Sequence, residues 1–108
     1  HRDLHSFPTR RSSDLPKFDA GWETTGAAAT LFVAELKSLT GATELQQIRL
    51  GIGQVLDYVH TIRNMPELRN RHVQPVLVLE HAPVDSRWEL LAESLGIILS
   101  WAPGFPRI

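Results

Sequence analysis

The feature that most constrains the fold is a long helical pattern between residues 44 and 62. Apolar side chains recur there at steps of three and four residues, the spacing that places them on one face of an α-helix. Thr43 can cap the first turn, and Glu44 brings a carboxylate to the helix end that favours negative charge. The apolar stripe consists of Leu45, Ile48, Ile52, Val55, Leu56, Val59 and Ile62. Such a helix needs a sheet or another helix to cover its apolar face.

Two glycines, Gly51 and Gly53, lie inside this helical pattern. Each costs about 0.5–1 kcal/mol relative to alanine in a helix interior. We therefore expect them to permit a close approach, either of the helix to a sheet or of a ligand to the helix.

Strand-like segments lie on both sides of this helix. Residues 31–37 form an apolar run that ends in an acid and an amine, and residues 17–23 alternate loosely and carry two aromatic rings. A turn near Gly26 would join these two segments, so we expect them to form a hairpin. Residues 73–79 form a nearly continuous apolar, β-branched run that is typical of a buried central strand.

A second helix and a last strand complete the pattern. Asp85 or Ser86 can cap a helix that continues to about residue 94, and residues 97–101 predict a strand. The predicted order is strand, strand, helix, strand, helix, strand, which favours an α/β domain with a mixed sheet. The residues of the second helix expected to face inward are Trp88, Leu91 and Leu95.

Composition excludes several classes of protein. The 108 residues suffice for one domain at most, since domains commonly have roughly 100–150 residues. The absence of cysteine excludes disulfides and thiolate metal sites. No apolar run approaches the ~20 residues that cross a membrane, and a net charge of −1 argues against a strongly basic coat for nucleic acid.

Residues 1–15 stand apart from the remainder of the chain. They have no apolar period, and their arginine- and serine-rich character would suit a transit peptide or a basic arm. Residues 5–15, however, resemble the translation of a common sequencing adapter. We therefore interpret residues 1–15 as an artefactual, non-native segment and residues 16–108 as the C-terminal part of a longer domain.

Glu35 and Lys37 form the first candidate site. Side chains alternate across a strand, so these two share one face of the segment 31–37. An acid and an amine at the end of a buried strand are unfavourable unless something there uses them. The alternative is a solvated pair at an ordinary strand end, and the pair by itself favours that reading. The hairpin could bring Asp19 near Glu35, although a solvated carboxylate at a strand edge fits Asp19 equally well.

A second stripe, more polar than the first, lies beside it on the long helix and consists of Gln47, Gly51, Gln54 and Tyr58. Gln54 and Tyr58 either lean over the Glu35–Lys37 pair or form a polar flank with a half-buried ring.

For two other polar features, a solvated or structural role is favoured over a functional one. The densest basic cluster after residue 15 is Arg63, Arg69 and Arg71, for which a solvated loop is favoured over a phosphate contact. His81 is an acid–base candidate by residue type, but a single histidine at a strand end is more often structural.

Together these elements resemble the PD-(D/E)xK nuclease superfamily. The resemblance covers residues 16–101, and the spacing of glutamine and tyrosine on the helix is similar to the Q-x-x-x-Y motif of the RecB-type branch. One departure is that no proline precedes the first acid of the pattern. The resemblance implies a restriction-endonuclease-like core that lacks its N-terminal elements. The matching residues are Asp19, then Glu35, Leu36 and Lys37, then Gln54 and Tyr58.

The resemblance also implies a mechanism. Mg²⁺ or Mn²⁺ would activate a water for the hydrolysis of phosphodiester bonds in nucleic acid. The expected substrate is DNA in preference to RNA, and the expected location is the cytoplasm. The implied metal ligands are Asp19, Glu35 and the Leu36 carbonyl, with Glu23 as a possible extra carboxylate. Lys37 would orient the attacking water, and Gln54 and Tyr58 would support the site from the helix.

Two alternatives stay open beside the nuclease. One is a nuclease-like module that binds nucleic acid or a partner without catalysis. The other is a structural α/β module in which Glu35 and Lys37 are solvated. The sequence leaves the oligomeric state open.

Overall fold

The computed structural model describes residues 20–23, 30–39, 43–68 and 70–104. Residues 1–15 and Asp19 lie outside these ranges, so the predictions made for them stay predictions. The elements are the strands β1 (Ala20–Glu23), β2 (Thr30–Lys37), β3 (His72–Leu79) and β4 (Ile98–Trp101), the α-helices α1 (Glu44–Arg63) and α2 (Arg87–Ser94), and the short 3₁₀ helix η3 (Pro66–Leu68). The predicted α/β class is confirmed.

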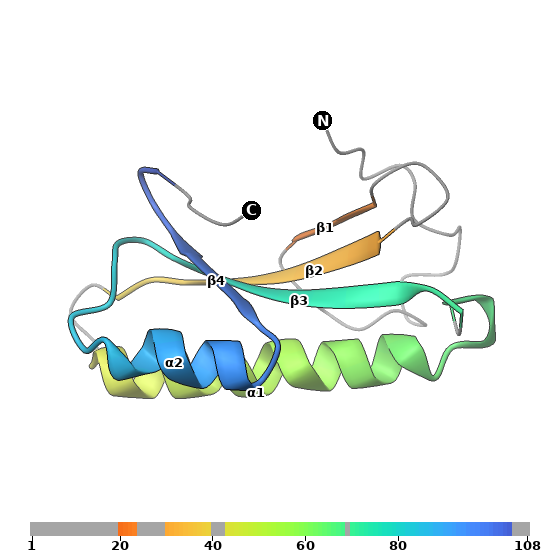
Figure 1. The fold of residues 1–108 in the computed structure, drawn as a ribbon, viewed down its shortest axis with the longest axis horizontal. Helices are drawn as coiled ribbons and strands as arrows, with labels where there is room; N and C mark the ends of the chain where they lie inside the picture. Colours follow the sequence, from red (N-terminus) through yellow and green to blue (C-terminus); the bar gives the residue numbers. More distant parts are fainter. Residues whose placement is uncertain (1–19, 24–29, 40–42, 69, 105–108) are drawn as a thin grey trace.

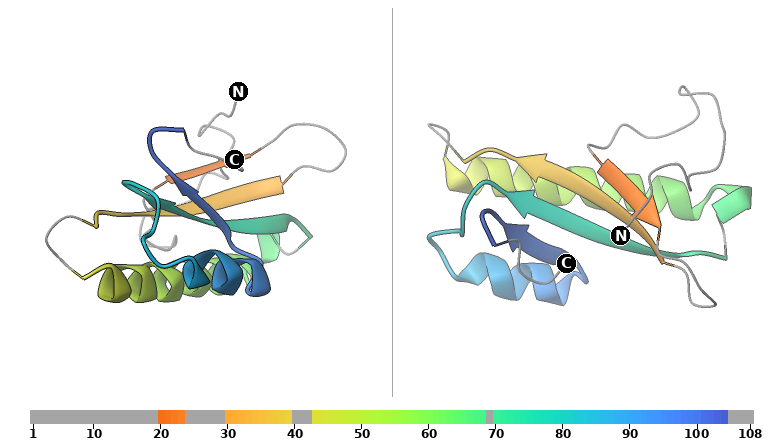
Figure 2. Two further views of the ribbon diagram at one scale, coloured as in Figure 1. Left: turned by 60° about the vertical axis from the view of Figure 1, so that its left-hand side comes forward. Right: turned by 90° about the horizontal axis from the view of Figure 1, so that it is seen from above.

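The four strands form one sheet in the spatial order β1-β2-β3-β4. β2, β3 and β4 run parallel to one another, and β1 is an antiparallel edge strand. Both α-helices connect parallel strands and lie on the same face of the sheet (Figure 1). Figure 2 shows α1 and α2 side by side on that face. This is the arrangement that right-handed crossovers between neighbouring parallel strands produce.

The core consists of two clusters that α1 connects. The first contains Ile48 and Val55 of α1, and the second contains Val59 and Ile62, all nearly inaccessible to solvent. The remaining members of the first cluster are Leu39, Leu77, Leu79, Trp88, Ala92, Ile97 and Leu99. The remaining members of the second are Leu31, Val33, Met65, Leu68 and Val73.

The ends of α1 agree with the sequence analysis. Thr43 is the N-cap, and its hydroxyl accepts a hydrogen bond from the Gln46 amide at 3.2 Å. That bond satisfies one of the amide groups that the first turn leaves unpaired. None of the helices in the described ranges combines the length and apolar character needed to cross a membrane.

The apolar faces of the helices are less completely buried than predicted. Leu45 on α1 is 39% exposed, and Leu91 and Leu95 at α2 are 39% and 41% exposed. Only Trp88, among the three residues expected to face inward from the second helix, is buried. The reason is that α2 is short and packs on β4 through Trp88 and Ala92, which leaves its other apolar side open.

Candidate functional site

Glu35 and Lys37 lie close together on the helix-facing side of β2. The Lys37 Nζ atom is 3.2 Å from Glu35 Oε2, and the two side chains are only 14% and 5% exposed. The predicted alternation is correct, because Val33 on the same side is buried while Leu36, on the opposite side, is 51% exposed. The pair is therefore largely withdrawn from solvent and is not an ordinary solvated ion pair. Burial of two charges is unfavourable unless they neutralise each other or serve a ligand.

Gly51 makes room for this pair beneath α1. A β-carbon at this position would lie 3.0 Å from Lys37 Cγ and 2.6 Å from Leu77 Cδ1. The close approach predicted for Gly51 is confirmed, and the neighbour is the sheet together with the stem of Lys37. Gly53 is different, since a β-carbon there would meet no atom within 4 Å. The expectation of close approach at Gly53 is therefore wrong for the described part of the protein.

Gln54 and Tyr58 continue along α1 from Gly51. The helix runs antiparallel to β2, because Gly51 lies over Lys37 whereas Tyr58 packs against the cluster that contains Val33. Gln54 stands one turn from Gly51, about 4.5 Å along the axis, and therefore alongside the part of β2 that carries Glu35. Its Oε1 atom is buried and has no hydrogen-bond partner among the described residues. A buried amide oxygen without a partner is unfavourable by roughly 1–3 kcal/mol, so it is a candidate ligand contact.

The candidate metal ligands are only in part within the described residues. Glu35 belongs to β2 and Leu36 follows it, but Asp19 lies outside the described ranges. Within those ranges, no group of three or more metal-ligating side chains occurs. The described part of the site therefore offers one carboxylate and backbone or amide oxygens.

A pocket of about 290 Å³ opens at the carboxyl ends of the parallel strands. Leu36 and its register partner Val78 line it, so the pocket opens on the face of the sheet opposite the Glu35–Lys37 pair, and Glu35 is not among its lining residues. Its lining residues are Leu36, Lys37, Ser38, Val78, Leu79, Glu80 and Ala102. In open α/β sheets, ligands bind at this end of the strands. The sequence analysis did not identify Glu80, whose Oε1 atom accepts hydrogen bonds from the Leu39 amide and from the Ser38 hydroxyl at 3.2 Å. Glu80 thus fixes the turn that follows Lys37. In the sequence, only its position directly after the predicted strand 73–79 could have indicated that it lies at the same end of the sheet as Lys37.

Glu23 does not join the candidate site. Its side chain is only 8% exposed, and it forms an ion pair with Arg71. It also pairs in register with Leu31, four residues or about 13 Å along β2 from Glu35. The earlier interpretation of Glu23 as an extra metal ligand is therefore wrong.

The predicted solvated basic cluster is largely structural. Arg71 pairs with Glu23, and Arg63 Nη2 donates a hydrogen bond to the Val73 carbonyl at 3.1 Å. Arg69 lies outside the described residues. His81 is exposed, and its Nδ1 atom lies 2.8 Å from the carbonyl oxygen of Ala82, a local contact that agrees with the structural interpretation.

The assembled group is a carboxylate, an amine and an amide oxygen on neighbouring elements. Comparison of the chain with profiles of known protein families, with curated protein sequences and with solved structures gives no match in any of the three. Oxygen donors suit hard cations such as Mg²⁺, and an amine beside them can neutralise charge on a phosphate.

Proposed function

We propose that this protein is a metal-dependent nuclease of the PD-(D/E)xK type that hydrolyses phosphodiester bonds in DNA. The observation that carries the proposal is the buried pair at the end of β2, with Lys37 Nζ 3.2 Å from the Glu35 carboxylate. An acid and an amine held together under a helix are a suitable basis for phosphate chemistry.

The order of the elements supports a restriction-endonuclease-like core. β1 and β2 are antiparallel neighbours, and α1 then leads to β3, which runs parallel to β2. Ala20 of β1 pairs with Ala34 of β2. In the sequence, Asp19 directly precedes Ala20 and Glu35 directly follows Ala34. On this basis we propose Asp19 as the second carboxylate of the site.

The oxygen donors fit Mg²⁺ or Mn²⁺. Mg²⁺ is commonly held by only one or two carboxylates, with waters and phosphate oxygens in the remaining positions. Glu35, the Leu36 carbonyl and Asp19 would hold the ion. The Gln54 Oε1 atom, which is buried without a hydrogen-bond partner in the described part of the chain, would supply a further acceptor for its hydration shell. When bound, the ion would neutralise phosphate charge and lower the pKa of a bound water.

The remaining side chains would position the reactants. Lys37 would donate a hydrogen bond to the attacking water and counter the negative charge that develops on the phosphate. Gln54 would orient a water from α1 through its amide. Tyr58, packed against the second core cluster, would hold this part of α1 against β2.

The direct test measures DNA cleavage by the full chain with Mg²⁺ or Mn²⁺. Glu35→Gln, Lys37→Met and Asp19→Asn should each reduce the rate by about 100-fold or more, and EDTA should abolish it. Glu93→Gln on the exposed face of α2 is the matched control and should keep full activity. Circular dichroism would verify that each variant is folded. Full cleavage by Glu35→Gln would refute the assignment, and faster cleavage of RNA would refute DNA as the substrate.

A structural role is the second candidate. It is favoured by the mutual neutralisation of Glu35 and Lys37 and by the lack of a three-ligand group within the described ranges. In that case the wild-type chain would show no cleavage with either metal, and Glu35→Gln would only alter stability. Binding of DNA without metal and without turnover would indicate an inactive, nuclease-like module instead.

A further inference from the structure

A groove on the outer side of the helical layer, between α1 and α2, has no part in the proposed catalytic site. Its volume is about 490 Å³, and the residues that line it are Arg49 and Ile52 of α1 and Arg87, Trp88 and Leu91 of α2. The Glu35–Lys37 pair lies between α1 and the sheet, so the groove and the pair are on different sides of the helix. An inference about the groove therefore does not depend on the nuclease assignment.

The groove combines an apolar floor with a cationic rim. Trp88 is only 3% exposed, but Leu91 beside it is 39% exposed and Ile52 is half-buried. Further exposed apolar side chains are Leu45, seven residues or about two turns before Ile52 on α1, and Leu95, four residues after Leu91, which are 39% and 41% exposed. Exposed leucines on two neighbouring helices are typical of a surface that binds another protein segment.

Both charged residues on the rim are arginines. Arg49 is exposed on α1, and the Arg87 side chain is 56% exposed. The Arg87 guanidinium stacks over the Trp88 ring, 4.4 Å from the ring centre, which holds it at the rim. Arg87 forms an ion pair with Asp85, with 3.6 Å between Arg87 Nε and Asp85 Oδ2, and no acidic side chain is among the five residues that line the groove. Two arginines and one neighbouring carboxylate leave the rim with a net positive charge, which is complementary to an acidic ligand.

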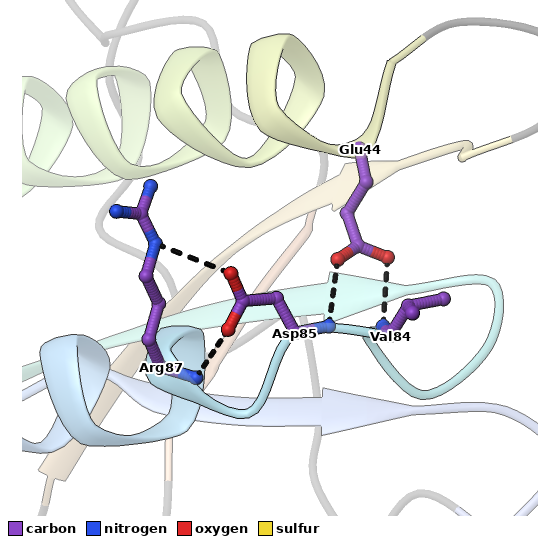
Figure 3. Close-up of polar contacts among 4 residues, drawn as sticks. All are labelled: Glu44, Val84, Asp85 and Arg87. Carbon is purple, nitrogen blue, oxygen red and sulfur yellow. Dashed lines mark hydrogen bonds and ion pairs between the residues drawn. The ribbon is translucent and has the colours of Figure 1, made fainter.

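The two walls of the groove are fixed relative to each other. Glu44, the first residue of α1, accepts hydrogen bonds from the amides of Val84 and Asp85 at 2.9 and 3.2 Å. Figure 3 shows this carboxylate holding the loop that leads into α2. Asp85 in turn accepts a hydrogen bond from the Arg87 amide at 3.0 Å. The groove is thus preformed, which lowers the entropic cost of binding.

We propose that this groove binds an acidic, amphipathic segment of a partner protein, whose leucine-type side chains fill the floor while its carboxylates pair with Arg49 and Arg87. A segment of this kind packs into a groove between two helices through residues spaced by three and four. Nucleic acid is a poorer fit, because it has no aliphatic surface to cover Leu91 and because Trp88 is too buried to stack on a base. A second copy of the chain would bring arginines against arginines unless another surface met the groove.

The test uses the full chain and two labelled synthetic peptides of about 18 residues, each with leucines at helical spacing. One peptide carries glutamates beside the leucines and the other carries lysines at the same positions. Fluorescence polarisation should show at least about tenfold tighter binding of the glutamate peptide, since like charges facing each other are strongly unfavourable. Equal binding of both peptides, or binding of neither, would overturn the proposal.

Two substitutions in the groove test whether the glutamate peptide binds there. Arg49→Gln should weaken the glutamate peptide about two- to fivefold, and Leu91→Glu should weaken it about tenfold or more. Asn70→Asp, an exposed position far along the chain with the same change in charge as Arg49→Gln, is the matched control and should bind like the wild type. Unchanged binding in both groove variants would refute the assignment of the site.

Two further measurements distinguish the partner protein from other ligands of the groove. Displacement of the glutamate peptide by an equal concentration of a short oligothymidylate would show that the arginines serve nucleic acid. Concentration-dependent dimerisation in sedimentation, lost in Leu91→Glu, would show that a second copy of the chain covers the groove. Either result would overturn the partner-protein proposal.

Discussion

Replacement of glycine by alanine at two neighbouring positions of α1 tests how closely this helix approaches the sheet. At Gly51, the added β-carbon would lie 2.6 Å from Leu77 Cδ1 and 3.0 Å from Lys37 Cγ. At Gly53, two residues along the same helix, it would meet no atom within 4 Å. Leu77 is fully buried in the first core cluster, so its side chain cannot move aside freely.

The two substitutions should therefore change stability in opposite directions. Alanine is better than glycine in a helix by about 0.5–1 kcal/mol, and this gain applies at both positions. At Gly51 it is opposed by overpacking, which costs about 1–3 kcal/mol. We expect Gly51→Ala to lower the free energy of unfolding by about 1 kcal/mol and Gly53→Ala to raise it by about 0.5–1 kcal/mol. For a domain of this size, 1 kcal/mol corresponds to roughly 4–8 °C in Tm.

Urea unfolding followed by circular dichroism would measure both variants against the wild type. Because both changes are glycine to alanine in one helix, the difference between them isolates the contact of α1 with Leu77 and Lys37. Stabilisation by Gly51→Ala equal to that by Gly53→Ala would refute the close approach of α1 to β2 and β3. If Gly51→Ala is destabilised as expected and the nuclease proposal is correct, it should also lose cleavage activity, since α1 would move away from Lys37.

Three further predictions concern polar side chains that are buried or hold a turn in place. Ser100→Ala should stabilise the protein by about 1 kcal/mol in thermal unfolding, because the Ser100 hydroxyl is fully buried and has no hydrogen-bond partner among the described residues; a loss of stability would reveal a partner for it. Arg71→Met should lower the free energy of unfolding by about 2–4 kcal/mol, because it leaves the Glu23 carboxylate buried without its partner. Adding Glu23→Leu should restore most of that loss, and equal stability of the single and double variants would contradict the pairing. Glu80→Ala should cost about 1–2 kcal/mol and accelerate hydrogen exchange at the Leu39 amide, whereas unchanged exchange would contradict the role of Glu80 in holding the turn.

The site was predictable from sequence only where its residues share one element. Alternation along β2 places Glu35 and Lys37 on one side, and steps of three and four along α1 place Gly51 and Gln54 on one stripe. Neither pattern reveals that the pair is buried, or that Gly51 rather than Gly53 faces it. Those facts depend on how α1 lies on the sheet, which is decided by Leu77 of β3 and by other residues distant in the chain.

Periodicity by itself determined the α/β class and the long helix, because both follow from the geometry of neighbouring residues. Tertiary structure alone decided the pairing of Glu23 with Arg71, the bonds of Glu80 to the turn after β2, and the groove between α1 and α2. These contacts join elements far apart in sequence, and no local pattern encodes which surfaces will meet. A carboxylate that reads as a ligand or a solvated charge in the sequence can therefore be a structural partner once the chain is folded.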